Sequence, residues 1–400
     1  MQKLLPLVLI AAVGGSPLRA QAEPEPDPVA TLVGRLDLER YKATIKGLTQ
    51  FGDRRQGTAR NRAALDWIEA QLRSYGCTDI QRLTYTYEPP APRQPAAGGR
   101  PPQARAGNRS QAAAGGGRYR GNRARTGVNN DSLAQPDPRL RALNAEPSVP
   151  GERQEIYCTK VGKTHPDEMY IVGAHMDGIG WAEAANDDGS GTAIVMELAR
   201  ILSDPAVETD RSIRFALWNN EESGLNGARA YVEQREALQG REEPAGSGRY
   251  PEPRWLGMIQ HDMMLWDHGM PRADGTVSPE QRPEADVNIE FQSNSKMAEG
   301  SARLAWLFHQ ANEKYATDYP AAVGPHMTNT DSGPFQDLVP AISLRENERG
   351  REIGAGWDPN WHQPTDRFTT YSDKDFRLGL NAAQTTLGAL GGLAGITLRP

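Results

Sequence analysis

The alternation of strand-like and helical patterns after Glu155 constrains the fold of this chain more than any other feature. Short apolar runs typical of buried strands alternate with longer segments whose apolar residues recur at helical spacing. Strands that alternate with helices predict a mostly parallel sheet with helices on both faces. We therefore expect an α/β fold, a single three-layer domain in which helices flank a mostly parallel, mixed sheet. The runs that carry this pattern are 169–174, 192–202, 213–218, 225–234, 256–260, 297–315, 341–344 and 373–393.

Residues 1–22 have the pattern of an export signal. Lys3 provides a positive start, residues 4–13 form an apolar run, and 20–22 form a cleavage site of the small-x-small type. The apolar run is too short to span a bilayer, so a cleaved signal peptide is favoured over an uncleaved membrane anchor. We expect an exported protein, periplasmic or extracellular, with no membrane contact after cleavage.

Composition divides the rest of the chain into three segments. Residues 23–88 carry helical patterns and a strand-like run, and residues 151–400 form the main domain. Between them, 89–150 is an insertion rich in Pro, Gly and Arg. We expect it to be largely disordered, because its first part, 89–129, lacks periodicity and large apolar residues. That part holds eight arginines and no acid, so the formal charge of −6 becomes −14 for the remainder, which argues against nucleic-acid binding.

The chain has two cysteines, Cys77 and Cys158. Export leads to an oxidising compartment in which two cysteines can pair. Cys77 follows a helical pattern at 58–75 and Cys158 lies in a strand-like run, so the sequence alone does not place them within bridging distance. At this level the pairing stays open.

Acidic and imidazole side chains follow four of the expected strands. Ligands bind beyond the carboxyl ends of strands in open α/β sheets, and these residue types are common zinc ligands. So many carboxylates buried together need cations to offset their repulsion. Each motif alone is weak evidence, but the ordered series is specific. Its five parts are H-x-D at 175–177, N-D-D-G-S-G at 186–191, N-N-E-E at 219–222, D at 262 and W-H-x-P-x-D at 361–366.

Taken together, these motifs resemble the two-zinc exopeptidases that include bacterial leucyl aminopeptidases, aminopeptidase Y and the glutamate carboxypeptidases. The resemblance covers the chain from about residue 157 to the C-terminus and implies a zinc-exopeptidase, phosphorylase/hydrolase-like fold. It also implies two Zn²⁺ ions that share one aspartate. By this resemblance, one ion is held by His175, Asp187 and Asp262, and the other by Asp187, Glu222 and His362.

The resemblance also assigns roles next to the metals. Asp177 is implied to hydrogen-bond His175 and fix its tautomer. Glu221, one residue before a metal ligand, is implied to be the general base. It takes a proton from a water that bridges the metals and passes it to the leaving amine. In this family the peptide bond after the bridging aspartate is often cis, which here is the bond between Asp187 and Asp188.

One position departs from the family pattern. Many members have Tyr directly before the last zinc-binding His, whereas this chain has Trp361. An indole N–H can donate a hydrogen bond but cannot accept one or ionise. Three interpretations stay open: Trp361 contacts the oxyanion, another donor does so, or Trp361 only lines the pocket. The remaining histidines are expected not to be ligands, namely His165, His261, His268, His309 and His326.

The expected activity is that of a zinc-dependent aminopeptidase acting on peptides. A carboxypeptidase or dipeptidase of the same fold is the alternative, and a glutaminyl cyclase is less favoured. The loop at 345–351 carries charges of both signs and does not separate these activities. A metal-free binding protein is the alternative from another class, but such a protein is expected to lack ligand residues that are all present here. We expect a peptide substrate and no obligate protein partner.

Overall fold

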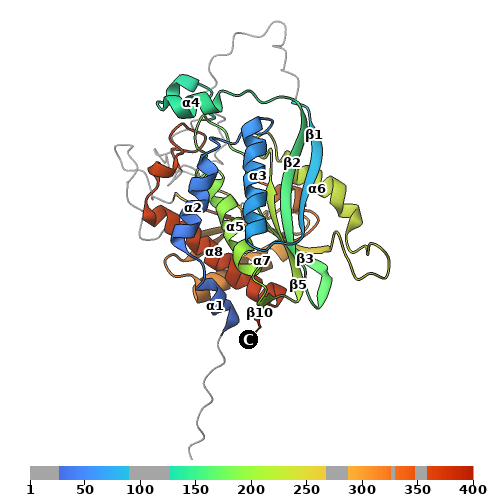
Figure 1. Ribbon diagram of the computed structural model, residues 1–400. Helices are drawn as coiled ribbons and strands as arrows, with labels where there is room; N and C mark the ends of the chain where they lie inside the picture. The colour runs from blue at the N-terminus through green and yellow to red at the C-terminus, as the bar shows by residue number, and fades with distance from the viewer. Residues whose placement is uncertain (1–26, 90–126, 267–286, 326–328, 347–357, 400) are drawn as a thin grey trace, which may run out of the picture.

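The computed structural model in Figure 1 describes residues 27–89, 127–266, 287–325, 329–346 and 358–399. The expected export signal and nearly all of the arginine-rich stretch lie outside these residues, as do His268 and His326. No helix in the described ranges is both long and apolar enough to cross a lipid bilayer.

The centre of the fold is an eight-stranded mixed sheet with the order β1-β2-β5-β3-β6-β9-β7-β8. The neighbouring strands β5, β3, β6 and β9 are all parallel, and β7 is parallel to β8. The pairs β1–β2, β2–β5 and β7–β9 are antiparallel. The mostly parallel mixed sheet is thus confirmed. Its strands are β1 (Ile80–Tyr87), β2 (Gly151–Lys160), β3 (His165–His175), β5 (Arg211–Trp218), β6 (Arg254–His261), β7 (Val287–Glu290), β8 (Ala321–Gly324) and β9 (Ala341–Arg345), while β4 (Val207–Glu208) and β10 (Thr397–Leu398) form a separate pair.

Helices cover both faces of this sheet (Figure 1). Successive side chains of a strand point to opposite faces. Along β3, Val172 and Ala174 therefore belong to the larger hydrophobic core, while Met169 and Ile171 belong to the smaller one. The larger core contains side chains of α1 (Pro28–Val33), α2 (Leu38–Thr49), α3 (Ala59–Ser74), α5 (Gly189–Leu202), α7 (Ala298–Tyr315) and α8 (Asp373–Ala394), and the smaller core those of α6 (Asn226–Arg235) and the short helix η3 (Gly333–Phe335).

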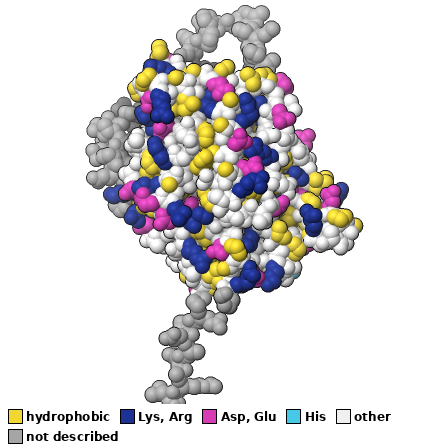
Figure 2. All heavy atoms as spheres, in the orientation of Figure 1, with side chains coloured by type: hydrophobic (Ala, Val, Ile, Leu, Met, Phe, Trp, Pro, Cys, Tyr) yellow, Lys and Arg dark blue, Asp and Glu magenta, His cyan; other side chains and the backbone are white. Residues whose placement is uncertain are grey.

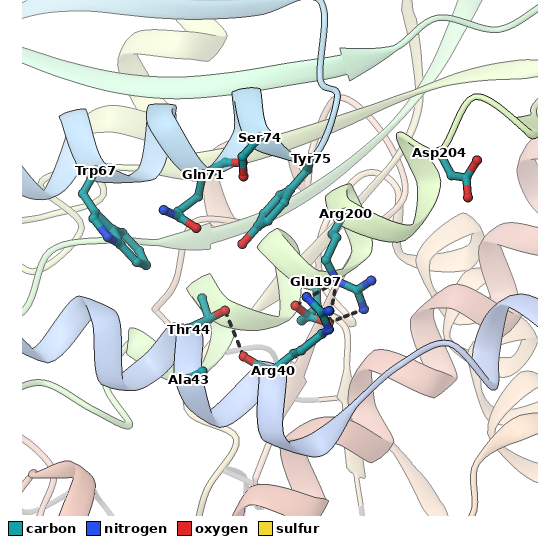
Figure 3. Close-up of a pocket in the computed structure, with 10 residues that line it drawn as sticks. All are labelled: Arg40, Ala43, Thr44, Trp67, Gln71, Ser74, Tyr75, Glu197, Arg200 and Asp204. Carbon is teal, nitrogen blue, oxygen red and sulfur yellow. Dashed lines mark hydrogen bonds and ion pairs between the residues drawn. The ribbon is translucent and has the colours of Figure 1, made fainter.

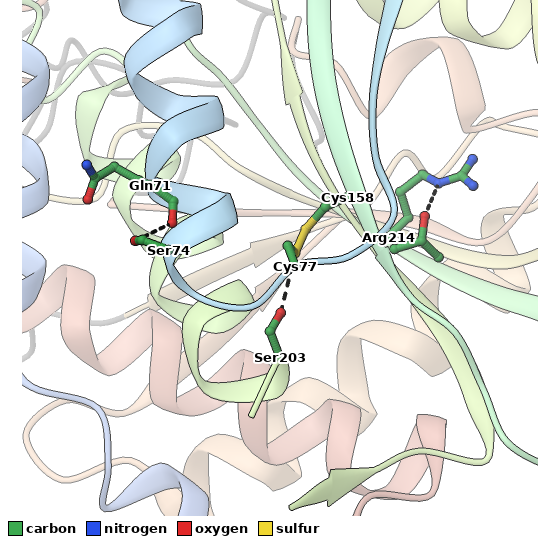
Figure 4. The surroundings of a disulfide bond; sticks show 7 residues. Gln71, Ser74, Cys77, Cys158, Ser203 and Arg214 are labelled. Atoms are coloured by element: carbon green, nitrogen blue, oxygen red, sulfur yellow. Dashed lines mark hydrogen bonds between the residues drawn. A yellow bond between two sulfur atoms is a disulfide. The ribbon is translucent and has the colours of Figure 1, made fainter. Parts of the chain in front are cut away.

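A disulfide joins Cys77 and Cys158, so the pairing that the sequence left open is present (Figure 4). Cys77 follows α3 and Cys158 lies within β2, with their Cα atoms 6.2 Å apart. Both cysteines are buried, and the Cys77 sulfur lies 3.3 Å from the hydroxyl of Ser203. The bond therefore links the helical layer to the sheet.

The last part of the expected insertion, residues 127–150, is folded, which differs from the disorder expected for 89–150. It contains the short helix η1 (Ser132–Ala134) and helix α4 (Pro138–Asn144). Asp137 caps α4 by accepting hydrogen bonds from backbone amides of its first turn, and proline follows at the first helical position. Leu140 of this short helix is buried.

Candidate metal centre

Three neighbouring strands bring expected site residues to one edge of the sheet. His175 is the last residue of β3, Glu221 and Glu222 lie in the turn after β5, and Asp262 comes directly after β6. Because β5, β3 and β6 are adjacent and parallel, their carboxyl ends meet at the same edge. Residues far apart in the sequence are therefore placed side by side.

Asp187 reaches this edge from the loop before α5, and its peptide bond to Asp188 is cis, as the resemblance implied. Asp188 is the N-cap residue of α5. Its Oδ1 accepts hydrogen bonds from the amides of Gly191 at 2.9 Å and Met263 at 3.2 Å, and its Oδ2 accepts one from the amide of His175 at 3.1 Å. One buried carboxylate thus ties the start of α5 to the ends of β3 and β6. The sequence motifs did not indicate this role for Asp188, although an aspartate before a helix start is a capping signal.

Two groups of three side chains converge here. In the first group, His175 Nε2 lies 3.3 Å from Asp187 Oδ1 and 3.9 Å from Asp262 Oδ1. In the second, His362 Nε2 lies 2.9 Å from both Asp187 Oδ2 and Glu222 Oε2. One ligand atom from each residue of a group lies within 4.8 Å of the others, a spacing that suits a metal ion. The two oxygens of Asp187 face different histidines, as a bridging carboxylate requires.

The electrostatics of both groups favour cations. Burial alone lowers the pKa of His362, but Glu222 and Asp187 outweigh burial and raise that pKa to about 10. Burial also lowers the pKa of His175, yet neighbouring carboxylates, first Glu221, raise it well above its usual value. Burial raises the pKa of Glu222 to about 7, and its buried Oε1 has no hydrogen-bond partner among the described residues. Two imidazoles and three carboxylates therefore form a donor set that fits divalent zinc.

Asp177 contacts His175 through its backbone. His175 Nδ1 lies 3.0 Å from the carbonyl oxygen of Asp177 and 3.8 Å from its Oδ1, so the ring N–H donates to the carbonyl. This bond leaves Nε2 to face Asp187, which is the tautomer a metal ligand needs. The carboxylate of Asp177 instead accepts a hydrogen bond from the amide of Glu221 at 3.0 Å. The hydrogen bond that the resemblance implied between Asp177 and His175 is thus made by the backbone carbonyl of Asp177.

The side chain of Glu221 is buried beside both groups. Its pKa is raised well above the usual range, first by burial and then by repulsion from other acids, of which Asp331 contributes most. A carboxyl group with a raised pKa holds a transferred proton more readily than one with the usual pKa. The burial of Glu221 and the direction of its pKa therefore agree with the role that the resemblance implied for it.

His362 and Trp361 lie in the loop 358–366. The Trp361 and His362 rings are stacked, with centroids 3.8 Å apart and 23° between their planes. At the end of the same loop, Asp366 accepts hydrogen bonds from the amides of Asn186 at 2.8 Å and Asp187 at 3.1 Å. The loop that carries one histidine is thus tied to the backbone of the shared aspartate.

Arg345 is a further buried residue of the site to which the motif analysis gave no role. It ends β9 and donates from Nη2 to Asp262 Oδ2 at 2.7 Å. Burial raises the pKa of Asp262, but Arg345 and His175 outweigh burial and lower it. An arginine that ends an apolar strand has to be paired when it is buried, and this rule is the signal that could have found it.

The other described histidines lie outside both groups. His261 Nε2 is 2.8 Å from the hydroxyl of Thr386, and His309 lies 3.8 Å from Glu313 on α7. His165 starts β3 and is therefore at the far end of the strand that His175 ends.

A groove of about 620 Å³ lies between α2, α3 and α5 (Figure 3). Most of its charges are already compensated, because Arg200 pairs with Glu197 at 2.7 Å and Asp204 pairs with Arg35 at 3.1 Å. On the face shown in Figure 2, basic and acidic side chains are interspersed. None of the expected site residues lines this groove, so it is separate from the candidate metal centre.

A mixed sheet with two histidine–carboxylate groups at its carboxyl edge is typical of the metallo-exopeptidases. The family model for peptidase family M28 matches residues 155–383, which is more than half of the chain. The chain therefore belongs to peptidase family M28, and the resemblance based on the motifs is confirmed.

Individual relatives agree with this assignment. The chain is 29% identical over 258 residues to the probable lipoprotein aminopeptidase LpqL of Mycobacterium tuberculosis, a match that covers 62% of this chain and 47% of LpqL. The chain thus spans about half the length, or less, of the curated relatives it matches.

Solved structures share the fold. BSAP, a zinc aminopeptidase from Bacillus subtilis, matches with a TM-score of 0.55 and 16% identity, over 90% of this chain and 95% of BSAP. A glutaminyl cyclase from Porphyromonas gingivalis matches with a TM-score of 0.53 and 16% identity, over 90% of this chain and 99% of the cyclase. The three-layer α/β architecture is therefore shared with enzymes of different activity.

Proposed function

We propose that this protein is an exported zinc aminopeptidase that removes the N-terminal residue of peptides. The observation that carries the proposal is the position of Asp187, whose two oxygens face His175 at 3.3 Å and His362 at 2.9 Å. Two Zn²⁺ ions would share this carboxylate, with Asp262 completing one ligand group and Glu222 the other. LpqL is described as an aminopeptidase and BSAP as a zinc aminopeptidase, which supports the same reading.

Each residue of the site has its own role in the proposed reaction. Zinc bound here would polarise the scissile carbonyl and lower the pKa of a coordinated water. Glu221 would take a proton from the attacking water and return it to the leaving amine. Asp177 holds the Glu221 backbone through its carboxylate and the His175 ring through its carbonyl. It would thereby keep the base aligned with one metal group.

The first test measures metal content and activity on the purified mature protein. We expect about two zinc ions per chain by elemental analysis, and release of aminoacyl anilides that a chelator abolishes and added zinc restores. N-blocked peptides should not be cleaved. A wild-type protein without zinc and without anilide hydrolysis would contradict the proposal.

The same assay panel separates the alternatives. Release of C-terminal residues would indicate a carboxypeptidase, and cleavage of dipeptides alone would indicate a dipeptidase. Cyclisation of N-terminal glutamine with one bound zinc would indicate a cyclase. The presence of both ligand groups favours two metals and hydrolysis.

Glu221→Gln tests the general base. The substitution keeps the shape of the side chain but removes its ability to take a proton, so we expect kcat to fall at least about 100-fold with zinc content unchanged. Glu299→Gln, the same change at an exposed position of α7, is the matched control and should leave kcat unaltered. Near-normal turnover of Glu221→Gln would exclude Glu221 as the base.

Export is tested by the N-terminus of the protein recovered outside the cytoplasm. Cleavage after Ala22 predicts a mature chain that begins at Glu23. Recovery of the protein in the cytoplasm with residues 1–22 intact would contradict export.

A further inference from the structure

Residues 127–145, here called the brace segment, contain a buried amide that connects two loops of the metal centre. The Gln135 side chain is fully buried. Its Nε2 donates to the carbonyl oxygens of Trp181 at 2.7 Å and Pro364 at 3.0 Å, and its Oε1 accepts from the amide of Asp137 at 3.1 Å. Both N–H groups of this amide are thus used, each on a different loop.

The two carbonyl groups belong to the loops that deliver metal ligands. Trp181 lies in the loop between β3 and α5, which leads into Asp187, and Pro364 follows His362 in the loop 358–366. These loops lack a β ladder of their own, so their relative position depends on contacts such as this one. Gln135 therefore acts on the second ligand group, in which Asp187 and His362 meet.

Other residues of the brace segment contact the same two loops. The backbone N–H of Asn129 donates to the backbone carbonyl of His362 at 3.0 Å, and Gln363 Nε2 donates to the carbonyl of Gly127 at 2.7 Å. At the other end of the segment, Asn144 Nδ2 donates to the carbonyl of Ala182 at 2.8 Å. Figure 1 shows α4, which ends at Asn144, at one end of the molecule above α2.

The first ligand group is held in a different way. His175 ends β3 and Asp262 follows β6, so the hydrogen bonds of the central parallel strands set their positions. Within the described residues, no hydrogen bond from the brace segment reaches either His175 or Asp262. The two groups share Asp187, and each also has a ligand near a strand end, so the contacts of the brace segment distinguish the groups through His362.

We propose that the brace segment positions the Asp187/Glu222/His362 group and that Gln135 is its central positioning residue. This inference rests on the proposed zinc function. Its consequence is that loss of the Gln135 hydrogen bonds weakens metal binding more at the second group, which contains His362, than at the first, which shares only Asp187 with it.

Gln135→Met tests this selectivity, because methionine fills a similar volume but cannot donate to the two carbonyls. Zinc affinity is measured on the full mature chain by competition with a chromophoric chelator, which yields two dissociation constants. His362→Ala identifies the constant that belongs to the second group. In Gln135→Met we expect that constant to rise about 10- to 100-fold, as for partners of metal ligands in general, and the other to change less than about threefold.

Two further variants serve as controls for Gln135→Met. Gln363→Met removes the hydrogen bonds from Gln363 Nε2 to the carbonyls of Gly127 at 2.7 Å and Trp361 at 3.5 Å, and should shift the same constant in the same direction by a smaller factor. Leu133→Ala changes an exposed residue of the brace segment and should shift neither constant. Equal weakening of both constants in Gln135→Met, with a lowered unfolding midpoint, would show a merely structural role and overturn the proposal. Two unchanged constants would overturn it as well.

Hydrogen–deuterium exchange provides a readout that needs no metal. In Gln135→Met, peptides covering 178–186 and 360–366 should exchange faster than in the wild type, while a peptide covering β6 should not. Unchanged exchange in both loops would contradict the positioning role of the brace segment even if the protein binds zinc. Wild-type protein that binds no zinc would instead contradict the proposed function. The exchange measurement would still test the positioning role of the brace segment.

Discussion

The backbone of Asp187 is held by another carboxylate and not by a strand or helix. The backbone N–H groups of Asn186 and Asp187 donate hydrogen bonds to the two carboxylate oxygens of Asp366. The Tyr371 hydroxyl also donates to this carboxylate at 2.9 Å. Burial, with repulsion from Asp358, raises the pKa of Asp366 to about 7. These three donors fix the position of the Asp366 carboxylate. The carboxylate in turn holds the backbone at Asn186 and Asp187. At the scale of single residues, the bridging geometry of Asp187 therefore depends on Asp366.

Asp366→Asn is expected to weaken zinc binding. Asparagine offers one acceptor oxygen, and its NH₂ group would face a backbone N–H that it cannot pair with. By the general effect of partners of metal ligands, we expect a loss of about 10- to 100-fold in zinc affinity, measured by chelator competition. Tyr371→Phe removes one donor but leaves both amide contacts, so its loss should be smaller. Wild-type affinity in Asp366→Asn would contradict this dependence.

Strand β2 carries a buried acid away from the ligand groups. Glu155 is 1% exposed and lies opposite Leu83 of β1. Burial, followed by repulsion from Asp331, raises the pKa of Glu155 well above its usual value of 4.5. The folded state therefore keeps a proton that the unfolded state releases above about pH 4.5. At the scale of the element, β2 loses stability as the pH rises from that value.

Glu155→Gln should remove this pH dependence, because glutamine resembles the protonated acid and does not titrate. The free energy of unfolding of the variant, relative to the wild type, should increase between pH 5 and pH 8. Urea unfolding at several pH values measures the difference. Glu152→Gln, an exposed position on the same strand, is the control and should show no such trend. A constant difference for Glu155→Gln would mean that Glu155 ionises normally in the fold.

The disulfide is the main covalent link between layers of the molecule. It joins residues 81 positions apart, and the enclosed chain includes β1, α4 and the brace segment. A link of this length restricts the unfolded chain and stabilises the folded one, in the chain-entropy model, by about 2–5 kcal/mol. At the scale of the whole molecule, it anchors the helix that precedes β1 to the second strand of the sheet.

Replacing both cysteines by serine should lower the free energy of unfolding by about 2–5 kcal/mol, measured by urea unfolding of the oxidised wild type and the variant. Zinc content should be retained, because Cys77 lies after the end of α3 and neither cysteine contacts a ligand group. Ser203→Ala, which removes only the contact to the Cys77 sulfur, should cost much less. Equal stability of the double variant and the wild type would show that the disulfide does not stabilise the fold.

Local patterns predicted most of the elements correctly. The helical pattern at 58–75 corresponds to α3, and the apolar runs at 169–174 and 213–218 lie within β3 and β5. The short strands β7 and β8 were not predicted, because neither VNIE nor AAVG is a run of large apolar residues. The folded part of the insertion was also missed, because its order comes from contacts with distant loops.

The sequence by itself determined the residue types of the site and their order along the chain, because strand alternation and ligand motifs are local patterns. It therefore predicted the α/β class, the family and the two groups of ligand candidates. The resemblance implied that Asp187 is shared, but only the tertiary structure decided that Asp177 uses its carbonyl, that the cysteines pair and that Gln135 joins two loops. These features depend on how segments far apart in sequence approach one another, and no local pattern records that approach.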